Sequence, residues 1–106
     1  SPTRKGRTMH IWLDDIRPAP KGWTWAKTYE EAMDLLDRGT AEAISLDHDL
    51  ADAAPDGRER TGYDVLLQIV QRKIDGFPVP ADVRVHSANP VGRARMLGTI
   101  ERYLSP

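Results

Sequence analysis

Acidic residues and histidines occur in three short clusters, each at the end of a run typical of a short β-strand. Residues 14–15 are Asp-Asp, residues 47–49 are Asp-His-Asp, and residues 86–89 are His-Ser-Ala-Asn. Carboxylates supply the hard oxygen ligands that Mg²⁺ prefers, and histidine exchanges protons near neutral pH. These residue types together could hold a divalent cation and transfer protons on a phosphoester.

The aspartates of these clusters are candidate metal ligands. Carboxylates that are crowded together repel one another unless one is protonated or a cation bridges them. We therefore expect Asp14, Asp15 and Asp49 to hold Mg²⁺ or another divalent cation. The alternative is structural: Asp14 and Asp15 would form Asx turns before Pro18, and Asp49 would cap backbone amides.

The two strand-end histidines are candidate proton-transfer groups. We expect His48 and His86 to be catalytic, one as general base and the other as general acid, with Asp47 as a third catalytic residue. The residues alone do not decide which histidine has which role. A single histidine in a loop is usually structural or solvated, so a purely structural role for both remains open.

A phosphate site is predicted where the last cluster leads into a helix. Asn89 is a good N-cap and Pro90 a good first helical residue, and the free N–H groups of a helix N-terminus attract anions. Arg93 lies in the first turn, where its charge opposes the helix dipole unless an anion is bound. We expect Ser87, Asn89 and Arg93 to bind phosphate.

The elements that position these clusters alternate between strands and helices. Short strands are predicted over residues 9–13, 23–26, 43–46 and 83–86, and helices after Thr28, after Thr61 and after Asn89. This order predicts an α/β fold, with a parallel sheet of about four strands in the order 2-1-3-4, as in flavodoxin-like proteins, and three helices on both faces. Residues 51–60 have loop composition, and we expect a mobile partial lid there whose arginines, Arg58 and Arg60, reach an anion on closure.

Composition restricts the function classes. The chain has 106 residues, no cysteine and no apolar run near 18 residues, which predicts one domain, no disulfide and a cytoplasmic protein without a membrane segment. Residues 1–8 lack an apolar pattern and are expected to be a disordered tail before a domain at 9–106. Omitting the tail's three basic residues leaves 12 basic against 16 acidic residues, or −4, which argues against binding duplex nucleic acid.

The stretches LDDIRPAP, ISLDHDL, TGYDVL and HSANPVGRARM resemble the cyclic-phosphate processing receiver domains over about residues 9–104. The resemblance implies a receiver-like fold without the fifth strand-helix unit. It also implies action on a small cyclic phosphate or an RNA 3′ end, as in RNA repair. By motif, the family's histidines correspond to His48 and His86 and its acidic positions to Asp14, Asp15, Asp47 and Asp49. The chain has no lysine beyond Lys73, so phosphorelay signalling is the weaker reading.

Three functions follow as hypotheses. The preferred one is a phosphoesterase that opens a cyclic phosphodiester by histidine acid–base catalysis. The second is a non-catalytic, receiver-like regulatory module that binds Mg²⁺, a nucleotide or an unidentified protein partner. The third is a metal-dependent phosphomonoesterase with Asp47 as nucleophile and both histidines incidental.

Overall fold

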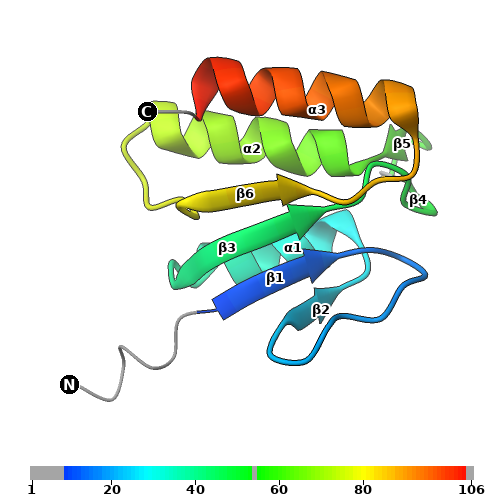
Figure 1. Ribbon diagram of the computed structural model, residues 1–106, viewed down its shortest axis with the longest axis horizontal. Helices are drawn as coiled ribbons and strands as arrows, with labels where there is room; N and C mark the ends of the chain where they lie inside the picture. The colour runs from blue at the N-terminus through cyan, green and yellow to red at the C-terminus, as the bar shows by residue number, and fades with distance from the viewer. Residues whose placement is uncertain (1–8, 54, 105–106) are drawn as a thin grey trace.

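A four-stranded parallel sheet forms the centre of the molecule (Figure 1). The computed structural model describes residues 9–53 and 55–104, so the expected tail at 1–8 lies outside the described residues. The strand order, β2-β1-β3-β6, is the predicted order 2-1-3-4, because β4 and β5 belong to a separate small hairpin. The strands of the sheet are β1 (Met9–Leu13), β2 (Thr24–Ala26), β3 (Ala41–Leu46) and β6 (Asp82–Val85).

The three predicted helices are present and begin at the predicted caps. They are α1 (Tyr29–Asp37), α2 (Gly62–Ile74) and α3 (Pro90–Tyr103). The Thr28 side chain accepts a hydrogen bond from Glu31 N, and Asn89 caps α3 in the same way through Gly92 N. No helix of the described chain is long and apolar enough to cross a membrane.

All three helices lie on one face of the sheet, so the prediction of helices on both faces is wrong. Helix α2 packs against both α1 and α3, which places the three in a single layer (Figure 1). The crossovers β2-α1-β3 and β3-α2-β6 run in the same direction across the sheet, and right-handed crossovers in one direction share a face. The connection from β1 to β2 runs in the opposite direction, and it is a loop with Pro18 and Pro20 instead of a helix.

The hydrophobic core lies between the helix layer and the sheet. Alternate residues of β1 and β3 face the helices, and Ile11, Leu13, Ile44 and Leu46 are fully buried. Burial of each such side chain contributes about 1.5–3 kcal/mol. The helices contribute Ala32, Leu36, Val65, Leu66, Ile69 and Met96 to this core.

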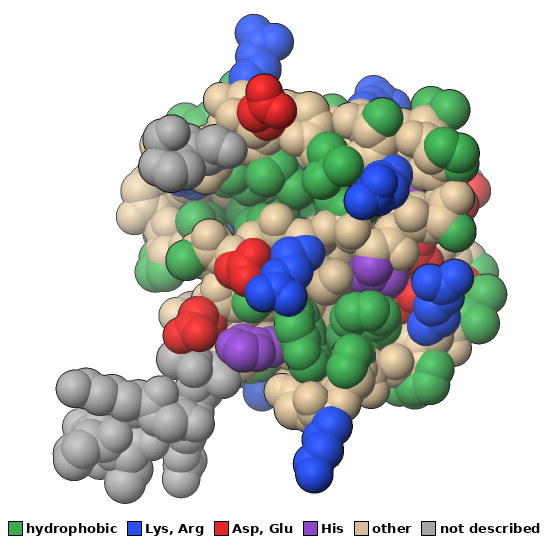
Figure 2. Space-filling view, in the orientation of Figure 1, with side chains coloured by type: hydrophobic (Ala, Val, Ile, Leu, Met, Phe, Trp, Pro, Cys, Tyr) green, Lys and Arg blue, Asp and Glu red, His purple; other side chains and the backbone are tan. Residues whose placement is uncertain are grey.

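The opposite face of the sheet carries aromatic side chains. Trp12 and His86 lie on it, and Trp23 contacts the edge of Trp12 with ring centroids 6.0 Å apart. Because α1 lies behind the sheet in Figure 1, that view looks onto the helix-free face. In the same orientation, Figure 2 shows apolar side chains gathered between histidine and basic side chains. This face therefore has no helix layer among the described elements.

The segment predicted as a loop at 51–60 contains a short antiparallel hairpin, β4 (Asp52–Ala53) and β5 (Glu59–Arg60). Asp52 accepts a hydrogen bond from Tyr29 N at the start of α1. Arg60 pairs with Glu30 and lies over the Tyr29 ring, also on α1. The expectation that Arg60 would turn toward the strand-end clusters is therefore wrong, since its charge is already used against α1.

Candidate functional site

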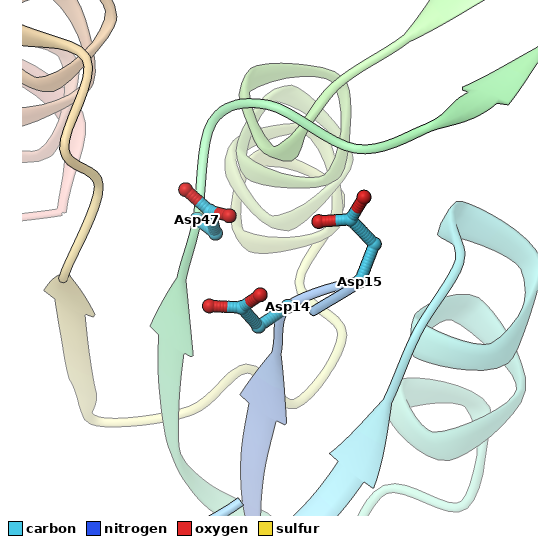
Figure 3. A group of neighbouring side chains, drawn as sticks. All are labelled: Asp14, Asp15 and Asp47. Atoms are coloured by element: carbon cyan, nitrogen blue, oxygen red, sulfur yellow. The ribbon is translucent and has the colours of Figure 1, made fainter. Parts of the chain in front are cut away.

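Three aspartates meet at the carboxyl ends of the strands (Figure 3). The register aligns Leu13 with Leu46, and Leu46 with Val85, so that residues 14, 47 and 86 follow side by side. The backbone ladder continues past the strand ends, because Asp47 N donates to Leu13 O and His86 N donates to Leu46 O. One carboxylate oxygen from each of Asp14, Asp15 and Asp47 lies within 4.8 Å of the other two.

Asp14 is the most strongly fixed of the three, and it is 2% exposed. Its Oδ1 accepts hydrogen bonds of 2.8 Å from both Ile16 N and Arg17 N, and its Oδ2 lies 3.1 Å from His86 Nε2. Desolvation by burial raises the pKa of Asp14, but the bonds from Arg17, Ile16 and His86 outweigh it and hold the pKa below its ordinary value. The Asx turn considered as an alternative is therefore present at Asp14.

Asp47 carries negative charge that its surroundings compensate poorly. Burial raises its pKa, and the nearby Asp14 and Asp15 carboxylates raise it further, against the lowering effect of His86 and Ser87. Carboxylate oxygens are the hard ligands that Mg²⁺ prefers, and a divalent cation would compensate the negative charge of the three aspartates. The acidic cluster could therefore bind such an ion, with Asp47 as a member.

Asp49, which was also predicted to bind metal, lies outside that group of three. Its Oδ1 is 2.8 Å from His48 Nδ1 and accepts a hydrogen bond of 3.2 Å from Asn89 Nδ2. These two bonds lower the pKa of Asp49. The carboxylate therefore links His48 to the N-cap of α3, and its role as a metal ligand stays a prediction.

Two glycines allow close approaches around His48. A Cβ added at Gly92, in the first turn of α3, would lie 2.5 Å from His48 Cγ and 2.6 Å from its Cδ2. A Cβ at Gly62, the first residue of α2, would collide with the carbonyl group of Asp47. Gly62 N also donates to His48 O at 2.9 Å. The helix starts can therefore pack onto the 47–48 segment only because both positions lack a side chain.

His86 has a different environment from His48. Its Nδ1 lies 2.7 Å from Ser45 Oγ, its Nε2 lies 3.1 Å from Asp14 Oδ2, and its ring stacks on Trp12. Desolvation by burial lowers the pKa of His86, although Asp14 and Asp47 act in the opposite direction. The neutral imidazole is therefore the favoured form, with Nε2–H donating to Asp14 and Nδ1 accepting from Ser45.

The two imidazoles are not brought into contact. His48 packs against α3 on the helix side, whereas His86 lies over Trp12 on the helix-free face. Within residues 9–53 and 55–104, no hydrogen bond or ring contact joins them. The geometry does not show both histidines acting on one phosphate, and their catalytic roles stay predictions.

A cavity of about 530 Å³ opens beside the acidic cluster, which is within the range of small-molecule sites. Four carboxylates, Arg17 and Ala88, which precedes the N-cap of α3, are among the residues that line it, and neither histidine lines it. The predicted phosphate residue Arg93 is exposed on α3 and does not line the cavity, so its role stays a prediction. The lining residues are Asp14, Asp15, Ile16, Arg17, Asp47, Asp49, Leu50, Ala51 and Ala88.

Sequence reasoning missed Arg17, Gly62 and Gly92 as residues of this region. Arg17 could have been found, since it lies three residues after Asp14, within reach of a turn closed by that carboxylate. A glycine in the first turn of each of two predicted helices was also visible, as a sign of close backbone approach. The side chain that approaches each glycine depends on how the helices are placed, so the sequence did not identify it.

Comparison with protein families gives one match. The model of the cyclic-phosphate processing receiver domain matches residues 9–102, which is most of the chain. Neither the curated proteins nor the solved structures contain a match. The match covers every strand of the parallel sheet and all three strand-end clusters.

Proposed function

This chain belongs to the cyclic-phosphate processing receiver domain family, and from that premise we propose that it is a phosphoesterase that opens a cyclic phosphodiester of a nucleotide or RNA-end derivative. The observation that carries the proposal is the pair formed by Asp49 and His48. Asp49 fixes His48 Nδ1, and no described residue forms a hydrogen bond with His48 Nε2. An imidazole that Asp49 orients, with one free nitrogen and packed against the first turn of α3, has what proton transfer requires, and Asp49 itself lines the cavity.

The proposed reaction is hydrolysis of one ring P–O bond. A water oxygen attacks phosphorus, the ring P–O bond breaks, and the products are a phosphomonoester and a free hydroxyl group. One proton leaves the attacking water and one reaches the departing oxygen. His48 Nε2 is the group that exchanges one of these protons, with Asp49 stabilising the imidazolium. Each general acid or base of this kind contributes about 10²–10⁴-fold in rate.

The phosphate would sit at the start of α3. Ala88 lines the cavity, and Asn89 and Ser87 hold the turn that begins the helix. Free backbone N–H groups and the helix dipole favour an anion at this position. We expect Ser87 and Asn89 to shape this seat, and Arg93 to contribute charge if its flexible side chain turns toward the cavity.

A phosphate beside the aspartates would be repelled unless a cation offsets their charge. Asp14, Asp15 and Asp47 would hold that cation, which when bound would withdraw electron density from the phosphoryl oxygens. Because Asp14 Oδ1 already accepts two backbone hydrogen bonds, Asp15 and Asp47 would be the more available ligands. Binding of the cyclic phosphate is therefore expected to require Mg²⁺.

The experiment follows a panel of cyclic phosphates by ³¹P NMR, with MgCl₂ or with EDTA. We expect ring opening with MgCl₂, and a loss of at least 100-fold in His48→Ala. His10→Ala is the matched control, because His10 is a histidine on β1 away from the cavity, and it should retain the parent rate. No turnover of any panel member, or an unchanged rate in His48→Ala, contradicts the proposal.

The alternative function is a non-catalytic, receiver-like binding module. The observation that favours it is His86, both of whose ring nitrogens are already bonded, so that a two-histidine mechanism would need His86 to release a partner. This alternative is expected to give Mg²⁺- or ligand-dependent stabilisation without ring opening. If Asp47→Asn alone abolishes turnover while both histidine variants remain active, the aspartyl-nucleophile hypothesis is correct instead.

A further inference from the structure

The backbone of the two residues after the acidic pair, Ile16 and Arg17, is held in place by one buried and one half-buried side chain. Asp14 Oδ1 accepts from both of their backbone N–H groups, and Trp12 Nε1 donates to Arg17 O at 3.1 Å. The loop is anchored a second time where Trp25 Nε1 donates to Asp14 O at 2.7 Å. An exposed loop is usually mobile, but here hydrogen bonds to buried or half-buried side chains fix its backbone.

The side chains that this fixed segment presents are unusual for a surface turn. Ile16 is 78% exposed, although it is a large aliphatic residue, and it lines the cavity. Arg17 also lines the cavity, and among the described residues its guanidinium has no hydrogen-bond or ion-pair partner. It is close enough to His86 to influence that residue's pKa. An unpaired cation and an exposed apolar side chain thus extend from one held stretch of backbone at the cavity wall.

We propose that Ile16 and Arg17 recognise the part of the ligand that surrounds the reacting phosphate, with Arg17 binding the phosphoryl group and Ile16 covering a planar ring attached to it. This inference rests on the proposed function and adds to it the two residues that would distinguish a cyclic phosphate carrying a heterocyclic base from one without a base. The guanidinium provides paired donors for phosphate oxygens, which a lysine could not. The isoleucine provides apolar area that a phosphate alone would leave uncovered.

The fixed backbone explains how two exposed side chains could give useful affinity. Ordering a flexible loop on binding weakens association, and a loop already held by Asp14, Trp12 and Trp25 avoids that loss. Arg17 lines the same cavity as Ala88, the residue before the N-cap of α3, so a phosphate there could contact a cation and lie near a helix N-terminus. The ring would then extend outward over Ile16.

The test measures dissociation constants by calorimetry in MgCl₂, with His48→Ala as the common background so that the probes stay intact, for two probes, cytidine 2′,3′-cyclic phosphate and base-free ribose 2′,3′-cyclic phosphate. We expect Ile16→Ala to raise the dissociation constant of the cytidine probe about fivefold and that of the base-free probe less than twofold. Arg17→Gln should raise the dissociation constants of both probes about tenfold, because it removes the positive charge that would bind the phosphoryl group present in both. Neither change removes a backbone hydrogen bond, so both variants should fold as the parent does.

Matched controls are Ile74→Ala and Arg102→Gln, an isoleucine 67% exposed near the end of α2 and an arginine in the last turn of α3. Both should bind the two probes as the parent does. The inference is overturned if Ile16→Ala affects both probes equally or neither, or if the parent binds neither probe. If the parent binds the cytidine probe through Ile16 but never opens its ring, the inference stands and the proposed hydrolysis fails.

Discussion

The imidazole of His86 lies parallel to the indole of Trp12, with ring centroids 3.8 Å apart and an angle of 7° between the planes. The stack covers one side of an imidazole whose two nitrogens contact Ser45 and Asp14, and only 14% of the side chain is exposed. A histidine so enclosed is held in one orientation. It fixes the second oxygen of Asp14, and through Asp14 the loop that carries Arg17.

The first prediction concerns pH. The pKa of His86 in the folded protein is below its ordinary value of 6.5, so the unfolded chain binds the proton more readily. His86 therefore stabilises the fold fully above about pH 6.5, and this contribution is lost as pH falls through the lower, folded-state pKa. Urea unfolding followed by circular dichroism should show the free energy of unfolding decreasing below pH 6.5.

His86→Gln serves as the control for that experiment, because glutamine cannot titrate. Between pH 6.5 and the onset of carboxylate titration, the free energy of unfolding should decrease much less in this variant than in the parent. Asp14 and Asp49 have lowered pKa values and contribute losses only at lower pH, below about 3.8. An identical slope in parent and variant contradicts the assignment to His86.

The second prediction compares two glycines of α3. Gly92→Ala places a Cβ 2.5 Å from His48 Cγ, so the imidazole must move, and we expect destabilisation of about 1–3 kcal/mol. A Cβ at Gly98 meets nothing within 4 Å, so Gly98→Ala should stabilise the protein by about 0.5–1 kcal/mol through helix propensity. Thermal unfolding checks both changes, and NMR of the His48 ring checks its displacement. If both variants are stabilised alike, α3 does not pack on His48 in this way.

The third prediction concerns the cap of α3. Asn89→Ala removes the side-chain oxygen that accepts a hydrogen bond from Gly92 N and should cost about 1 kcal/mol of stability. It also removes the hydrogen bond to Asp49, so the pKa of Asp49 should rise toward its ordinary value. Thr28→Ala removes the corresponding cap of α1 and is the matched control, with a similar loss of stability. If the pKa of Asp49, measured by NMR titration, rises in Asn89→Ala and not in Thr28→Ala, the hydrogen bond between Asn89 and Asp49 is supported. Equal pKa values in the two variants would exclude it.

The fourth prediction concerns the cation. Because the pKa of Asp47 is raised, its charged form opposes folding at neutral pH, and Asp47→Asn should raise the melting temperature in EDTA. The parent should be stabilised by millimolar MgCl₂, and Asp47→Asn much less. Asp34→Asn, at an exposed position of α1, should respond as the parent does. Equal responses to MgCl₂ in all three proteins would exclude Asp47 as a ligand.

Most of the fold could be predicted because its signals are local. Thr28 and Glu31, or Asn89 and Pro90, identify a helix start from neighbouring residues alone. The placement of the helices on one face already follows from the predicted strand order and right-handed crossovers, because both crossovers that contain a helix run in the same direction; the prediction of helices on both faces was drawn from the strand-helix alternation alone. The hairpin at 52–60 was missed because its strands have two residues each, too few for a periodic pattern.

The candidate site could be predicted only in part. That residues 14, 47 and 86 lie side by side follows from parallel strands of known order. The pairing of each carboxylate with a particular histidine does not follow from strand order, because side-chain contacts depend on the exact register and on loop geometry. The pairs found, Asp14 with His86 and Asp49 with His48, could not be distinguished from other pairings in the sequence.

The indole hydrogen bonds have a spectroscopic consequence. The chain has three tryptophans, and two of them donate to the backbone of the loop that lines the cavity, at Asp14 O and Arg17 O. The third, Trp23, contacts one of these, Trp12, through an edge-to-face pair. Tryptophan emission from this protein therefore arises from two rings bonded to this loop and a third that touches one of them, so a label-free fluorescence titration is expected to respond when a ligand enters the cavity.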